Sequence, residues 1–312
     1  MPAIVVDSLR KSYDGTEALR GISFDVADGE IFGFLGPNGA GKTTTIKILT
    51  TLIAPSAGRA TVLGYDILSQ GAEIRRRIGV VQQKESYELN LSVEKSLDLY
   101  GLLWNVSKER RVALVEELLE KFGLTEDRRT KAYDLSIGMR KRLQVAREFV
   151  HDMDLIFLDE PTTGLDPIAR RAALDFFREK AKSGWTIFFT THMLEEAEYL
   201  CDRIALINEG KIVVLDSPGN IKRRFGSTKT IELKVRQSLP EDFQVRLRAL
   251  STVESFSLKD DRTVAIVSQT PEEVIAQILR DTQRFGLEIF SIYVAEPSLE
   301  EAFISVMTRE VA

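Results

Sequence analysis

The sequence contains a single cysteine, Cys201, among 312 residues. No disulfide can therefore form within the chain, and a metal site built from several thiolates is excluded. We expect Cys201 to be a small buried apolar residue, and the scarcity of cysteine fits a reducing cytosol. No uncharged apolar run approaches the roughly 18 residues of a membrane-spanning helix, and the first residues lack the basic and apolar regions of a secretory signal.

The charge balance is slightly acidic, with 42 Lys and Arg residues against 47 Asp and Glu residues and a net charge of −5. An excess of negative charge argues against a surface that binds nucleic acid. The basic runs at 75–77 and 140–142 lie in segments with helical spacing, so we interpret them as solvated helix faces or dimer contacts. The length leaves room for one large domain and a smaller one.

Residues 36–44 read GPNGAGKTT and directly follow the apolar run 31–35. The pattern G-x-x-x-x-G-K-[ST] after a strand is typical of a phosphate-binding loop. Gly36, Gly39 and Gly41 allow the backbone to bend tightly and to expose successive N–H groups to an anion. A simple glycine-rich turn does not need the Lys-Thr-Thr ending, so the segment indicates a nucleoside triphosphate site.

The residues that close this loop carry the chemistry of the pattern. Lys42 would place a positive charge near the β and γ phosphates, and the hydroxyl of Thr43 could bind Mg²⁺. The segment 43–53 has helical spacing, and its positive N-terminal end would also face the phosphates.

Two adjacent acids, Asp159 and Glu160, follow the apolar run 155–158. Isolated buried charge is costly, so two carboxylates at the end of a buried strand suggest a site. Asp159 could hold Mg²⁺ through its water shell, and Glu160 could take the proton from an attacking water. A strand end that reaches solvent would explain the acids alone, but the phosphate-binding loop upstream makes a hydrolytic site the better interpretation.

Four further signals occur in a fixed order along the chain. Gln83 follows the apolar stretch 78–81, and its spacing favours it over its neighbour Gln82. The segment LSIGM at 135–139 opens a helix, with Ser136 as a plausible N-cap. GLDP follows the two acids at 164–167, and His192 follows the strand-like segment 186–190.

In this order the motifs strongly resemble those of the nucleotide-binding domain of ABC ATPases, over roughly residues 3–220. The resemblance implies catalytic roles for Glu160, the switch histidine His192 and the Q-loop residue Gln83. It implies Mg²⁺ ligands Thr43, Gln83 and Asp159. It implies ATP contacts from Tyr13, which would stack on adenine, and from Gly36, Asn38, Gly39, Ala40, Gly41, Lys42, Thr43, Thr44, Ser136 and Gly138.

Members of this family work as homodimers that enclose two ATP molecules, so the resemblance implies that Ser136 and Gly138 contact the ATP of the second subunit. Ile137 and Met139 depart from the common LSGGQ signature, and a methionine in the last position resembles the drug- and lipid-export branch. The resemblance implies a separate integral-membrane permease that carries drugs, lipids or other hydrophobic compounds. It places the chain on the cytoplasmic face of the membrane, and it implies no nucleic acid among the partners.

The expected fold is α/β, with an ABC-type P-loop nucleotide-binding domain at 1–222 and its helical subdomain at about 85–150. A basic stretch at 222–229 then changes the pattern. Residues 228–312 predict a small α+β domain of ferredoxin-like β-α-β-β-α-β order, followed by a helix at 299–308. We interpret this domain as a module for stability or dimerisation rather than a ligand sensor.

Two alternatives remain. One is a soluble ABC protein that binds ribosomes or DNA, which the single nucleotide domain and the acidic charge disfavour. The other is an inactive regulator, which is disfavoured because Lys42, Asp159, Glu160 and His192 are all present.

Overall fold

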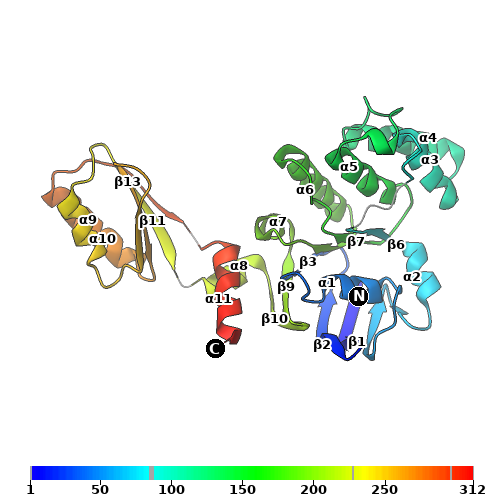
Figure 1. Cartoon of the computed structure of the whole chain (residues 1–312), viewed down its shortest axis with the longest axis horizontal. Helices are drawn as coiled ribbons and strands as arrows, with labels where there is room; N and C mark the ends of the chain where they lie inside the picture. Colours follow the sequence, from blue (N-terminus) through cyan, green and yellow to red (C-terminus); the bar gives the residue numbers. More distant parts are fainter. Residues whose placement is uncertain (1, 84–87, 227, 296, 312) are drawn as a thin grey trace. The chain divides into compact units, whose positions relative to one another are not determined.

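The computed structural model describes residues 2–83, 88–226, 228–295 and 297–311, and the chain divides into two compact units, Met1–Ser217 and Pro218–Ala312 (Figure 1). The division lies before the boundary expected at residue 222. The reason is that α8 (Pro218–Phe225) packs against α11 (Leu299–Val311), so both helices belong to the second unit.

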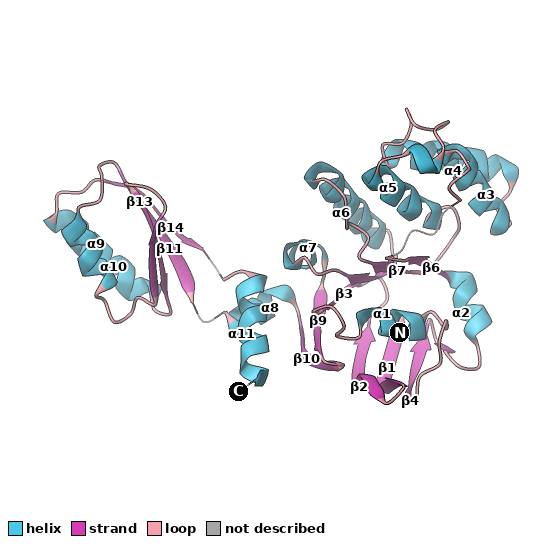
Figure 2. Cartoon of the chain, in the orientation of Figure 1, coloured by secondary structure: helices cyan, strands magenta, loops and turns pink. Residues whose placement is uncertain are grey.

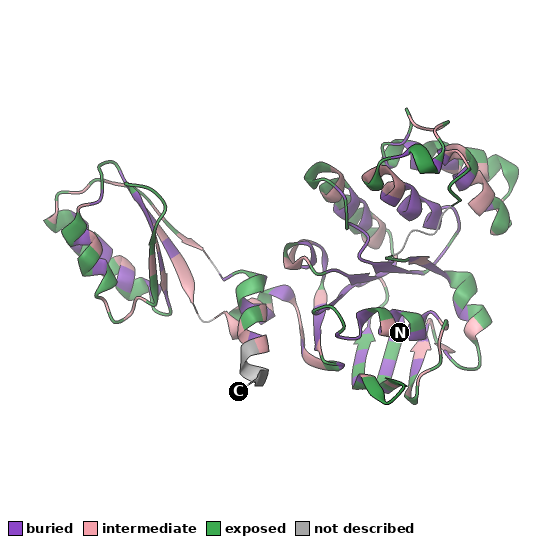
Figure 3. Cartoon of the chain, viewed as in Figure 1, coloured by how far each residue is buried: buried purple, intermediate pink, exposed green. Residues whose placement is uncertain are grey.

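A six-stranded sheet forms the centre of the first unit, in the order β10-β9-β3-β8-β7-β6. Its neighbouring strands are parallel except β10, which pairs with β9 in an antiparallel hairpin. Its members are β3 (Ile31–Leu35), β6 (Ile78–Val81), β7 (Leu155–Asp159), β8 (Thr186–Thr190), β9 (Arg203–Asn208) and β10 (Lys211–Asp216). Every residue of β3, β7 and β8 is buried, as expected of apolar strands covered on both faces (Figure 3).

A second sheet of the first unit has the order β2-β1-β4-β5 and is antiparallel. Its strands are β1 (Ile4–Tyr13), β2 (Thr16–Val26), β4 (Ala57–Val62) and β5 (Tyr65–Asp66). Helix α1 (Lys42–Leu49) lies between the two sheets and joins them in one hydrophobic core (Figure 2). Aromatic rings cross this core, with Phe24 of β2 stacked on Phe32 of β3 at a centroid distance of 5.4 Å.

The remaining elements of the first unit are helical: α2 (Gly71–Arg77), α3 (Val93–Leu103), α4 (Lys108–Lys121), the 3-10 turn Ala132–Asp134, α5 (Ile137–Glu148), α6 (Pro167–Lys182) and α7 (Leu194–Leu200). Helix α3 contacts both α4 and α5, and the three helices lie within the helical subdomain expected at about 85–150. Its expected start near residue 85 lies outside the described residues. Ser136 caps α5 as expected, because its Oγ accepts a hydrogen bond from the backbone N–H of Met139 at 3.2 Å.

The second unit contains an antiparallel sheet in the order β12-β13-β11-β14. Its elements are β11 (Lys229–Val235), α9 (Glu241–Arg248), β12 (Ser255–Leu258), β13 (Thr263–Ser268), α10 (Pro271–Arg284) and β14 (Ile289–Ala295). The order β-α-β-β-α-β is the one expected from the sequence. Phe243 of α9 and Ile278 of α10 are fully buried with Ile231 and Ile266 of the sheet, so this unit has a hydrophobic core of its own.

Candidate functional site

The sequence motifs meet at one edge of the parallel sheet. Strands β3, β8, β7 and β6 are consecutive neighbours, and each is followed by one motif. The loop 36–44 follows β3, and His192 follows β8. Asp159 is the last residue of β7 and Glu160 follows it, while Gln83 follows β6. Because the carboxyl ends of parallel strands meet at the same edge, the topology brings together residues from four distant parts of the chain.

The glycines of the loop have the conformations and contacts that the motif requires. Gly39 and Gly41 have φ angles of 83° and 112°, in the left-handed region that other residues rarely adopt. A Cβ at Gly36 would lie 2.1 Å from the carbonyl oxygen of Ile207 in β9, so only glycine fits there. The loop therefore lies close against the sheet, and α1 begins immediately after Gly41.

Lys42 lies within the curve of this loop and is only 6% exposed. Its Nζ donates hydrogen bonds to the carbonyl oxygens of Gly36 at 2.7 Å and of Pro37 at 3.1 Å. Burial lowers the pKa of Lys42, and the carboxylates of Glu160 and Asp159 act against that shift. The loop thus presents a buried cation beside two acids.

A cavity of about 320 Å³ opens at this point, which is within the usual range for small-ligand sites. Its lining comes from the loop, from the start of α1 and from the ends of β6 and β7. The lining residues are Ala18, Asn38, Gly39, Gly41, Lys42, Thr43, Thr44, Gln83 and Glu160. Eight of these nine residues, all except Ala18, are residues predicted to bind nucleotide or to catalyse its hydrolysis.

Asp159 is held by two hydroxyl groups. Thr43 Oγ1 donates to Asp159 Oδ2 at 3.2 Å, and Thr190 Oγ1 donates to Asp159 Oδ1 at 2.7 Å. Hydroxyl, carboxylate and amide oxygens are the ligands that Mg²⁺ prefers, and Mg²⁺ usually keeps waters and substrate phosphates as its other ligands. Thr43, Asp159 and the nearby Gln83 therefore fit a magnesium ion that is shared with a bound nucleotide.

Glu160 is the point on which several side chains converge. Its Oε2 accepts hydrogen bonds from Gln83 Nε2 and Thr163 Oγ1, each at 3.3 Å, and lies 3.4 Å from His192 Nδ1. The residue is buried, and its φ of 50° is an uncommon left-handed value for a side chain of this size. Left-handed conformations of this kind cost energy in residues other than glycine and recur at active sites. The environment fixes the carboxylate at the edge of the cavity.

Three predicted contact residues lie elsewhere. Tyr13 is 44% exposed at the end of β1, with Lys11 Nζ 5.1 Å from its ring centroid, and it does not line the cavity. Ser136 and Gly138 lie at the start of α5 and do not line the cavity either. Their roles toward adenine and toward the ATP of a second subunit therefore stay predictions.

The sequence analysis missed a contact between α5 and the loop that contains Gln83. Lys141 Nζ and Gln144 Nε2 both donate to the carbonyl oxygen of Gln82, at 3.1 Å and 2.9 Å. The expectation that residues 140–142 form a solvated face is therefore wrong for Lys141, which is buried. The spacing of three residues places both side chains on one face of the helix, but it does not identify their partner.

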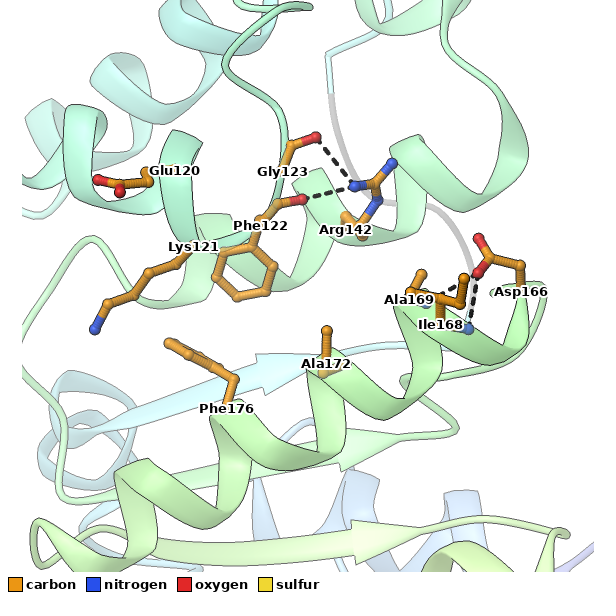
Figure 4. A pocket seen from close by; sticks show the side chains of 11 residues that line it. Glu120, Lys121, Phe122, Gly123, Arg142, Asp166, Ile168, Ala169, Ala172 and Phe176 are labelled. Atoms are coloured by element: carbon orange, nitrogen blue, oxygen red, sulfur yellow. Dashed lines mark hydrogen bonds between the residues drawn. The ribbon is translucent and has the colours of Figure 1, made fainter.

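A larger cavity, of about 390 Å³, lies between the end of α4 and α6 (Figure 4). Its Arg142 donates to the carbonyl oxygens of Phe122 and Gly123, at 2.9 Å and 3.0 Å. Its Asp166 caps α6 by accepting from the backbone N–H of Ile168 and Ala169. Arg142 and Asp166 thus serve the local backbone, and the size of a cavity alone does not locate the catalytic site.

Comparisons with known proteins agree with the geometry. The model of the family described as ABC transporter matches residues 19–163. The linearmycin resistance ATP-binding protein LnrL of Bacillus subtilis (strain 168) is 32% identical over 97% of this chain and 97% of its own length. The daunorubicin resistance ATP-binding protein DrrA3 of Streptomyces coeruleorubidus is 35% identical over 97% and 95%, and the Nod factor export ATP-binding protein I of Rhizobium johnstonii is 34% identical over 99% and 96%.

Solved structures show the same fold. The ATP-binding subunit of an ABC transporter superimposes with a TM-score of 0.67 and 28% identity, over 72% of this chain and 93% of that one. A dimeric ATP-binding cassette bound to ADP and Pi gives a TM-score of 0.64 at 23% identity, over 69% and 98%, which supports the fold alone. In the described part of the chain, no helix is both long and apolar enough to cross a membrane. The chain is therefore an ATP-binding, ATP-hydrolysing member of the ABC transporter family.

Proposed function

We propose that this ATPase drives an exporter whose cargo passes through a separate membrane permease. The similar proteins named above are a linearmycin resistance protein, a daunorubicin resistance protein and a Nod factor export protein. Their names support the export of drugs, lipids or other hydrophobic compounds. The chain itself would work on the cytoplasmic face of the membrane, where ATP is available.

The observation that carries the proposed mechanism is the convergence of Gln83, Thr163 and His192 on Oε2 of Glu160. A carboxylate fixed at the edge of the cavity can accept a proton from water, and a positioned general base of this kind is the usual requirement for such hydrolysis. Glu160 is the proposed base, and His192 and Gln83 orient it and the reacting groups. Lys42, with the N-terminal end of α1, neutralises the phosphate charge.

Thr43, Gln83 and Asp159 are the proposed ligands of Mg²⁺. The ion would neutralise the charge of the phosphate oxygens when bound. The chain's own contribution is to hold the ligands in place. Thr190 fixes the Asp159 carboxylate from the side of β8, at 2.7 Å, and thereby keeps its other oxygen directed at Thr43.

The proposed working unit is a homodimer that forms when ATP binds. Tyr13 would stack on adenine, while Ser136 and Gly138 would contact the ATP of the other subunit. Tyr13 and Ser136 are exposed, Gly138 is half-buried, and none of the three lines the cavity of its own chain, which is compatible with both roles. The proposed domains are the nucleotide-binding unit and a C-terminal unit that adds stability or dimer contacts.

The proposal predicts that a neighbouring reading frame encodes a membrane permease, and co-expression of that permease with this chain tests it. We expect the two proteins to co-purify from detergent-solubilised membranes, and the reconstituted pair to move an amphipathic drug in an ATP-dependent way. The pair that contains Glu160→Gln should assemble but not transport. An active ATPase that instead sediments with ribosomes or DNA, without a membrane partner, would support the soluble alternative.

A further inference from the structure

Glu196 is a buried acid outside the motifs, on the short helix α7. It is only 3% exposed, and its Oε2 accepts hydrogen bonds from two threonine hydroxyls. Thr162 Oγ1 donates at 2.8 Å and Thr191 Oγ1 donates at 2.7 Å. Both threonines are buried as well. One carboxylate oxygen therefore joins two loops that are otherwise separate in the sequence.

These two loops carry the proposed catalytic side chains. Thr162 lies two residues after Glu160, and Thr191 immediately precedes His192. Thr191 Oγ1 also accepts a hydrogen bond from the backbone N–H of Met193 at 3.0 Å, so the segment around His192 is held on both sides. The contact of Thr162 and Thr191 with one acceptor thus fixes the spacing between the loops after β7 and β8.

The charge of Glu196 is compensated from a third element. Arg170 Nε of α6 lies 3.5 Å from Glu196 Oε1, and Arg170 Nη2 donates to the carbonyl oxygen of Leu165 at 3.3 Å. A buried carboxylate is retained only when it is paired and hydrogen-bonded. The contacts of Glu196 therefore extend from the two catalytic loops to the GLDP segment.

We propose that Glu196 is a positioning residue for ATP hydrolysis. It holds the two loops so that His192 Nδ1 stays beside Glu160 Oε2, at the observed 3.4 Å. Glu196 does not line the nucleotide cavity, so it acts through Thr162 and Thr191 rather than on the substrate. This inference rests on the proposed roles of Glu160 and His192.

The test compares Glu196→Ala with Glu195→Ala in the purified full chain. Glu195 is the exposed neighbour on the same helix and receives the same truncation. We expect Glu196→Ala to lower kcat about 10–100-fold while the affinity for ATP stays unchanged, because misplaced catalytic groups mainly affect the chemical step. Glu195→Ala should keep the wild-type kcat. Glu196→Gln retains an oxygen for the two hydroxyls and should recover part of the lost kcat.

Two smaller substitutions separate positioning from a general loss of stability. Thr191→Val and Thr162→Val remove one hydroxyl each and preserve the shape of the side chain. Each should lower kcat without changing ATP affinity, and neither should lower it further in the Glu196→Ala background, because all three changes break the same contact. If Glu196→Ala does not fold, the two valine variants still give the expected loss of kcat.

Two results would overturn the inference. One is a wild-type kcat in a folded Glu196→Ala or in both valine variants. The other is an equal loss of kcat and of ATP affinity, with melting behaviour that shows general destabilisation. Glu160→Gln is measured in parallel. Full turnover in that variant would remove the proposed mechanism and this inference together, whereas an inactive Glu160→Gln beside a fully active Glu196→Ala would remove this inference alone.

Discussion

Thr43 Oγ1 donates a hydrogen bond to Asp159 Oδ2 at 3.2 Å, although the two residues are 116 positions apart in the sequence. Thr43 comes after β3, and Asp159 is the last residue of β7. In the sheet, β8 lies between these two strands. Thr190 of β8 bridges the interval by donating to Asp159 Oδ1. The phosphate-binding loop and the acidic strand are thus connected through hydroxyl groups at the carboxyl edge of the sheet.

The contact leads to a prediction about magnesium. Asp159→Asn removes the charge of the proposed ligand and should raise the Mg²⁺ concentration for half-maximal ATP hydrolysis by about 10–100-fold. Titration of ATPase activity with Mg²⁺ measures this shift. Thr43→Ser keeps the hydroxyl and should leave the titration near that of the wild type. An unchanged magnesium requirement in Asp159→Asn would exclude Asp159 from the metal site.

A second prediction concerns contact between subunits. Ser136→Arg should abolish ATP-dependent dimerisation without weakening the binding of ATP to one subunit. Sedimentation and nucleotide titration in the Glu160→Gln background measure the two properties. Because the change also removes the N-cap of α5, Ser107→Arg, which removes the equivalent cap of α4, is the control. If the affinity of one subunit for ATP falls by the same factor as the affinity of dimerisation, Ser136 instead contacts the nucleotide of its own chain.

A third prediction is that the fragment 1–217 folds and binds ATP. Every proposed site residue lies within it, and the second unit has a separate hydrophobic core. The cut belongs after Ser217 because α8 packs with α11 in the second unit. ATP affinity should equal that of the full chain, while ATP-dependent dimerisation should be weaker. Lost ATP binding in a folded fragment would contradict the first expectation, and an unchanged dimerisation constant the second.

A fourth prediction follows from Glu148 of α5, which is buried and accepts a hydrogen bond from the backbone N–H of Val80 at 3.2 Å. Burial raises the pKa of Glu148 from 4.5 to about 7. Between about pH 4.5 and pH 7 the folded state therefore holds a proton that the unfolded state has already released. The stabilising contribution of this protonated group is lost as the pH rises through about 7. The shift corresponds to a change in the free energy of unfolding on the order of 3 kcal/mol between low and high pH.

The variant Glu148→Gln keeps an acceptor for Val80 and removes the titration. Relative to the wild type it should be more stable at about pH 8, and the difference should shrink toward about pH 5. Denaturant unfolding of the full chain across this range measures the difference. A difference that stays constant with pH would mean that Glu148 does not titrate with the raised pKa.

The sequence was most informative where one local pattern carries both structure and chemistry. The glycines before Lys42 and the acids after an apolar run predict a strand, a loop and a site at once, and in the structure these segments lie side by side. Glu196 was not found this way, because its partners are hydroxyls on two other loops. The end of the first unit was placed five residues late, because the partner of α8 lies about 80 residues further along the chain.

The most direct test of the mechanism is phosphate release by purified Glu160→Gln, measured together with ATP affinity. The substitution keeps the shape of the side chain and the charge of Asp159, and it removes only the proposed base. We expect hydrolysis to fall about 10²–10⁴-fold, ATP affinity to stay unchanged and an ATP-bound dimer to accumulate, while Glu195→Gln behaves as the wild type. Phosphate release near the wild-type rate in Glu160→Gln would contradict the assignment of Glu160 as the base.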